Sequence, residues 1–90
     1  MPVLMIAEVP NLTEEIYSGL IDQMAPLMRA SKGFISHAGG PSPAGGWRVV
    51  EIWESEKDGQ TWFDEKVKPN LPPEIVPDRQ YFPLHAAITK

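Results

Sequence analysis

The sequence predicts one α+β domain in which four short strands and two helices follow the order βαββαβ. Two segments carry apolar residues at helical spacing, and four short apolar segments are typical of strands. The ten prolines and seven glycines fall mainly between these segments, where they favour loops. Because 90 residues fit one domain, we expect a single unit over residues 1–90.

The first strand is predicted over residues 3–9, a short apolar run closed by a proline. A helix follows over residues 13–30, because Thr13 can cap its start and apolar side chains then recur at helical spacing. Pro26 lacks the N–H that would bond back to the preceding turn, so the last turn should kink or restart there. Gly33 favours the end of this helix.

A hairpin is predicted next, with strands over residues 34–39 and 47–54 and a loop rich in Gly and Pro over 39–46. Alternation along the later strand separates two sets of side chains: Trp47, Val49, Glu51 and Trp53 on one face, and Arg48, Val50, Ile52 and Glu54 on the other. Both faces are largely apolar, so we expect both to be covered.

The carboxy-terminal third should form a helix over residues 55–68, an arm over 69–80 and a last strand over 81–89. The arm contains four prolines, which exclude regular structure and indicate an extended segment. It also carries apolar side chains, so we expect it to pack on the domain as a lid or a dimer strap. These side chains are Leu71, Ile75 and Val76.

This element order, with right-handed crossovers, is typical of a ferredoxin-like sandwich whose antiparallel sheet has the strand order 4-1-3-2. Both helices would lie on one face of that sheet. The other face would be bare, which a small acidic monomer does not tolerate when that face is apolar. We therefore expect a homodimer in which two bare faces pair and close an α+β barrel.

The charge balance excludes several classes of partner. Eight Lys and Arg against twelve Asp and Glu give a net charge of −4, the wrong sign for binding nucleic acid or an anionic membrane. No apolar run approaches the ~18 residues of a membrane span, and no signal-like segment is present, so we expect a cytoplasmic protein. There are no cysteines, and the two histidines have no neighbouring ligand cluster, so we expect no metal site.

His37 and Glu51 are the candidate catalytic residues. Pairing across the hairpin brings His37 opposite Val49 or Glu51, so that the imidazole and a carboxylate share a face. Such a carboxylate can fix the tautomer of the imidazole and raise its basicity, which a proton-abstracting site needs. The alternatives are a hydrogen-bonded structural histidine, and a Glu51 that pairs with Arg48 or with a lysine across the dimer.

The candidate substrate-binding residues are aromatic or lie at the rim of the same face. Three could line an aromatic pocket or simply form the core: Trp53, Trp62 and Phe63. Tyr17 and Tyr81 could offer hydroxyls at the rim. His85 is placed on the last strand, at the opposite sheet edge from His37 and roughly 14 Å away, where it binds either substrate or backbone.

Residues 50–56, Val-Glu-Ile-Trp-Glu-Ser-Glu, precede the helix that holds Trp62 and Phe63. This stretch resembles the third-strand and second-helix signature of the dimeric α+β barrel proteins of the antibiotic-biosynthesis-monooxygenase type. The resemblance covers the whole chain and implies a pocket between the sheet and the helices. It implies activities that range from oxygenation of aromatic polyketides and haem degradation to isomerisation, polyketide cyclisation and plain ligand binding.

The same resemblance bears on cofactors. Trp62 stands where haem-degrading members have a tryptophan against the porphyrin, but Val9 stands at their asparagine position and Pro72 lies near their axial-histidine position. We therefore expect no haem and no other cofactor.

These expectations combine into one functional hypothesis with one alternative. The hypothesis is a small cofactor-independent monooxygenase, or a cyclase or isomerase acting by enolisation, on a hydrophobic aromatic or polyketide-like molecule. The alternative is a non-catalytic ligand-binding or accessory dimer.

Overall fold

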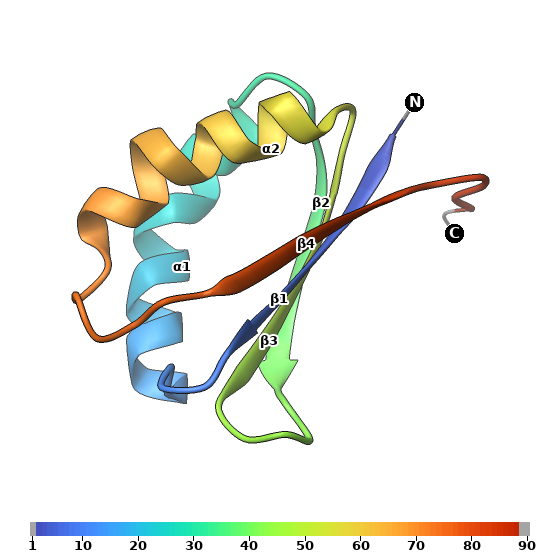
Figure 1. Ribbon diagram of the computed structural model, residues 1–90. Coiled ribbons are helices and arrows are strands. Elements are labelled where there is room, and N and C mark those ends of the chain that lie inside the picture. The colour runs from blue at the N-terminus through green and yellow to red at the C-terminus, as the bar shows by residue number, and fades with distance from the viewer. Residues whose placement is uncertain (1, 89–90) are drawn as a thin grey trace.

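The computed structural model describes residues 2–88, and its elements follow the predicted order (Figure 1). The strands are β1 (Val3–Val9), β2 (Phe34–Pro41), β3 (Trp47–Trp53) and β4 (Asp78–Pro83). The helices are α1 (Glu14–Arg29) and α2 (Glu56–Trp62), and α2 continues into a π-helical turn (Phe63–Val67) and a 3₁₀ turn (Lys68–Asn70).

The four strands form one antiparallel sheet in the order β2-β3-β1-β4, which is the predicted order read from the other edge. Both helices lie on the same side of this sheet, and β4 runs along its far edge (Figure 1). The predicted ferredoxin-like α+β sandwich is therefore confirmed. The central strand β3 lies between β2 and β1, so its side chains are the ones that several elements can reach.

Local sequence chemistry starts both helices where it was expected to. The Thr13 hydroxyl accepts a hydrogen bond from the Ile16 amide at 3.3 Å, and the Ser55 hydroxyl accepts one from the Asp58 amide at 3.1 Å. Helix α1 continues through Pro26 to Arg29, so the helix does not restart there, and the expected kink stays a prediction. The proline falls in the last turn, where only one backbone hydrogen bond is lost.

Three segment boundaries differ from those predicted. The helix expected over 55–68 changes to π-helical geometry after Trp62, and the second strand reaches Pro41 rather than ending at residue 39. The last strand covers Asp78–Pro83 instead of 81–89, because β1 offers partners from Glu8 down to Val3 and Pro83 cannot extend the ladder. Residue 89 lies outside the described residues.

The core fills the space between the sheet and the helices in two adjoining clusters. One joins the inner face of β1 to the arm, and its members are Met5, Ala7, Val9, Leu12 and Ile75. The other joins both helices to the end of β3, and its members are Met24, Met28, Trp53 and Trp62. The arm is thus partly docked, since Ile75 is buried, whereas Val76 is exposed.

The opposite face of the sheet carries apolar side chains that no helix of residues 2–88 covers. Its residues alternate with the buried ones along each strand and include Leu4, Ile6, Val50, Ile52 and Phe82. Within residues 2–88, no helix is long and apolar enough to cross a membrane.

Candidate functional site

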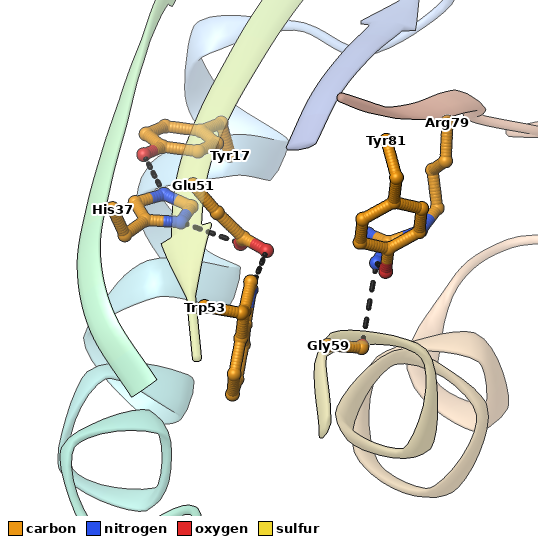
Figure 2. A network of polar contacts seen from close by, with 7 residues as sticks. All are labelled: Tyr17, His37, Glu51, Trp53, Gly59, Arg79 and Tyr81. Atoms are coloured by element: carbon orange, nitrogen blue, oxygen red, sulfur yellow. Dashed lines mark hydrogen bonds and ion pairs between the residues drawn. The ribbon is translucent and has the colours of Figure 1, made fainter. Parts of the chain in front are cut away.

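A chain of four hydrogen-bonded side chains lies on the inner face of the sheet (Figure 2). The Tyr17 hydroxyl is 2.6 Å from Nε2 of His37, and Nδ1 of His37 is 2.8 Å from Oε2 of Glu51. The other carboxylate oxygen of Glu51 accepts a hydrogen bond from the indole N–H of Trp53 at 2.8 Å. We call Tyr17, His37 and Glu51 the relay.

Strand register brings His37 and Glu51 together, because the two residues are direct partners in the β2–β3 ladder. A β-bulge between Phe34 and Ser36 shifts the alternation of β2 by one residue. As a result Phe34, which packs against Trp53, and His37 face the same side although they are three positions apart. The alternative ion pair of Glu51 with Arg48 does not form, because Arg48 pairs with Glu8.

The relay has a defined proton arrangement. Glu51 is only 4% exposed, and its carboxylate can only accept, so Nδ1 of His37 carries the proton between them. In the neutral imidazole, Nε2 of His37 is then the acceptor for the Tyr17 hydroxyl. Burial, and next the negative charge of Glu51, raise the pKa of Tyr17, so the phenol stays protonated at neutral pH.

Gly39 makes room for the Tyr17 hydroxyl. A Cβ atom at this position would lie 2.5 Å from that oxygen, so only glycine allows the phenol to reach His37 over β2. The sequence placed Gly39 where the predicted strand meets the Gly- and Pro-rich loop, and its contact with Tyr17 was not predicted. The signal available was a glycine adjoining a predicted strand, which often marks a close approach of another group.

The relay borders a cavity of about 80 Å³ between the sheet and the helices. All three relay residues line it, together with apolar side chains from β1, α1 and the turn after α2. Trp62 and Phe63 also line this cavity, and their role in binding a substrate stays a prediction. The indole nitrogen of Trp62 is buried and has no hydrogen-bond partner among the described residues.

Arg79 is a second polar feature of the cavity wall, and the sequence analysis missed it. Its guanidinium lies 4.2 Å from the centre of the Phe63 ring. It donates to the Tyr81 hydroxyl at 2.6 Å, and the Arg79 and Tyr81 side chains are both drawn in Figure 2. It also donates to the Gly59 carbonyl at 3.4 Å, while its Nε is buried without a partner. Within residues 2–88, Arg79 forms no ion pair, so an uncompensated positive charge borders the cavity.

The remaining predicted residues lie elsewhere. Trp53 is fully buried, packs against Phe34 and Trp62, and reaches the site only through Glu51. Tyr81 holds Arg79, and burial raises the pKa of its phenol more than the nearby guanidinium lowers it. His85 follows the end of β4 and is exposed, so its expected position on a covered strand face is wrong. Within residues 2–88, no three His, Asp or Glu side chains gather into a metal-binding group.

Comparisons with known proteins identify the fold. No protein-family profile and no curated protein matches this sequence. Among solved structures, the chain is similar to a variant of SnoaB, a cofactor-independent oxygenase from Streptomyces nogalater, with a TM-score of 0.68, 8% identity and coverage of 99% and 98% of the two chains. It is also similar to MhuD, a heme-degrader from Mycobacterium tuberculosis, with a TM-score of 0.58, 18% identity and coverage of 97% and 99%.

A third similar structure is a Bacillus cereus protein assigned to the antibiotic-biosynthesis monooxygenases, with a TM-score of 0.51, 16% identity and coverage of 99% and 95%. The MhuD structure holds two hemes in its active site. The expectation that the chain takes no haem or other cofactor is therefore wrong, because a protein with this fold binds heme. It relied on residue positions near Val9 and Pro72, and the same fold accommodates a porphyrin in MhuD.

In the present structure the residues do not form a haem site as they stand. His37 is the imidazole at the cavity, and both of its ring nitrogens are hydrogen-bonded. The cavity of about 80 Å³ is also below the ~300–1,000 Å³ of typical small-molecule sites. We therefore derive the chemistry below from the side chains of this chain alone. In strand order, helix placement and structural similarity, the chain has the same fold as SnoaB and the Bacillus cereus antibiotic-biosynthesis monooxygenase structure.

Proposed function

We propose that this protein is a monooxygenase-type enzyme that removes a proton from a hydrophobic aromatic or polyketide-like molecule. The observation that carries the proposal is the buried relay of Tyr17, His37 and Glu51 at the wall of an apolar cavity. The similarity in fold to SnoaB supports oxygenation as the reaction that follows, while fold alone does not assign the chemistry.

The relay can move a proton away from a bound substrate in one concerted step. Tyr17 accepts the substrate proton on its oxygen as it passes its own proton to Nε2 of His37. The imidazole then carries two protons, and the Glu51 carboxylate at Nδ1 stabilises that positive charge. Burial of Glu51 strengthens this stabilisation, because little water screens the pair.

Arg79 is suited to hold the negative charge that remains on the substrate. It borders the same cavity, and its guanidinium makes no ion pair within the described part of the chain. Phe63 and Tyr81 fix its position, so it needs no rearrangement when charge develops on an enolate or phenolate oxygen. The deprotonated, electron-rich ring is the species that O₂ then oxidises.

A second function, ligand binding without catalysis, is favoured by one observation. Both ring nitrogens of His37 are already satisfied, which is also the arrangement of a structural histidine. Structures of the protein with candidate aromatic ligands separate the two functions. The enzyme requires a ligand whose acidic C–H or O–H lies within hydrogen-bonding reach of the Tyr17 oxygen. If no candidate ligand enters the cavity because aromatic side chains of the protein occupy it, the hydrogen-bonded side chains of the relay have only a structural role.

We also propose that the chain forms a homodimer through the uncovered sheet face. Leu4 and Ile6 on β1 are paired with Ile52 and Val50 on β3, which gives a continuous apolar surface. Sedimentation at micromolar concentration should give about 20 kDa, twice the 10.0 kDa chain. Val50→Glu should produce the monomer, whereas Leu27→Glu, on the exposed side of α1, should not. A 10 kDa wild-type species would refute the dimer.

A further inference from the structure

We infer that the ligand site extends from the cavity into an outer cleft between α1 and β2, where Arg29 recognises an anionic substituent on an aromatic ligand. This inference rests on the proposed function for the identity of the inner site. It assigns the larger part of the ligand to a surface that the mechanism does not use.

Volume is the first argument. The cavity of about 80 Å³ is well below the ~300–1,000 Å³ of typical small-molecule sites. The cleft between α1 and β2 has a volume of about 330 Å³. A ligand with two or more fused rings therefore fits the two spaces together but does not fit the cavity alone.

Shared walls are the second argument. Three side chains line both spaces: Ile21 and Met28 of α1, and His37 of β2. The partition between cavity and cleft is thus one residue layer thick and includes the relay imidazole. Because β2 is an edge strand of the sheet, the cleft lies at the side of the molecule where no further strand closes it.

The chemistry of the cleft is the third argument. Its walls include Ala25 and Phe34, and Arg29 is its one formally charged side chain among residues 2–88. Arg29 forms no ion pair within this part of the chain. It is not needed to satisfy the end of α1 either, because the carbonyls of residues 26–28 already accept hydrogen bonds from the Ala30 and Ser31 backbone amides and the Ser31 hydroxyl. In a chain of net charge −4, this cation favours a carboxylate, a sulfonate or a phenolate at the mouth of the cleft.

A matched pair of fluorescent probes tests this assignment without any turnover. The probes are 1-anilinonaphthalene-8-sulfonate, which has an aromatic body and an anionic group, and N-phenyl-1-naphthylamine, which lacks that group. We expect Arg29→Ala to weaken binding of the sulfonate about fivefold at low salt and to leave binding of the neutral probe within about twofold. Arg29→Lys should retain most of the difference, and 1 M salt should remove it.

Ala25→Phe tests the cleft itself, because the added ring fills space beside Met28. It should weaken both probes by about tenfold or more, while Gln23→Phe, on the exposed side of α1, should weaken neither. Lys68→Ala controls for the loss of one positive charge away from the cleft.

The inference is overturned if Ala25→Phe leaves both affinities unchanged, if Arg29→Ala affects the two probes equally, or if neither probe binds the wild type saturably. Loss of turnover in relay variants that bind both probes normally bears on the proposed reaction alone. Normal turnover in Ala25→Phe would count against the cleft and would leave the proposed reaction unaffected.

Discussion

Replacement of Glu51 by Gln is the sharpest perturbation of the relay, because it keeps the shape of the side chain and changes which atoms can accept. The carboxylate accepts from Nδ1–H of His37 and from the indole N–H of Trp53. A Gln amide can accept at its oxygen only. One of the two donors must therefore face the NH₂ group.

The buried environment selects between the two orientations of that amide. If its oxygen turned to His37, the Trp53 N–H would face the amide NH₂, and a buried donor without a partner costs about 1–3 kcal/mol. If its oxygen turns to Trp53, the NH₂ donates to Nδ1 of His37 and every group there is satisfied. His37 must then carry its proton on Nε2, where it can no longer accept one from Tyr17.

The wrong tautomer removes the base function, so we expect Glu51→Gln to lower kcat/KM by about 10² to 10⁴-fold. The free energy of unfolding should fall by only about 2 kcal/mol, because two charge-assisted hydrogen bonds become neutral ones. Long-range ¹H–¹⁵N spectra of the imidazole report the tautomer directly and need no substrate. They should show the proton on Nδ1 in the wild type and on Nε2 in the variant. An unchanged tautomer with kcat/KM within a few-fold of wild type would refute the reasoning.

Gly39→Ala should lower turnover about tenfold to 10²-fold, because the new Cβ would lie 2.5 Å from the Tyr17 hydroxyl and displace it. Gly40→Ala is the control, since the space around Gly40 is open, and an equal loss of turnover in both variants would contradict the contact. Ile75→Ala should lower the free energy of unfolding, measured in urea, by about 2–4 kcal/mol, since this arm residue is 4% exposed and packs in the core. A change below about 0.5 kcal/mol would show that the arm is not docked. The contribution of Tyr17 to stability should be constant below pH 10 and fall above it, because burial raises its pKa in the folded protein and the unfolded phenol ionises first. Tyr17→Phe should make that fall shallower, and an identical pH profile would contradict the raised pKa.

The pairing of His37 with Glu51 could be predicted from the sequence because it depends on short-range order. A Gly- and Pro-rich loop joins two neighbouring strands, and the alternation along β3 puts Glu51 on the same side as Trp53. Hairpin registry then leaves few partners for His37. The structure adds a bulge in β2, which sets the side of this edge strand that His37 faces.

Arg79 could not be predicted, because its position depends on where β4 begins. The prolines of the arm suggested an unpaired segment up to residue 80, whereas pairing with β1 starts at Asp78 and puts Arg79 opposite Ala7. The small Ala7 side chain leaves room for the guanidinium on the inner face. Such a contact between strands distant in sequence has no local signal. The same holds for the cleft beside Arg29, whose volume depends on how α1 packs against β2.

The central claim is that Tyr17 and His37 together remove a proton from a bound aromatic molecule. Anaerobic hydrogen–deuterium exchange tests it most directly, because it detects proton removal without requiring oxidation. Anthrones and naphthols that bind the protein would be incubated in D₂O and their acidic C–H positions followed by NMR.

For at least one of these bound compounds, the wild type should accelerate exchange over buffer by about 10² to 10⁴-fold, and Tyr17→Phe and His37→Ala should each abolish the acceleration while binding is retained. Exchange at the buffer rate for every compound that binds, or acceleration that survives both substitutions, would contradict the relay as the site of proton abstraction.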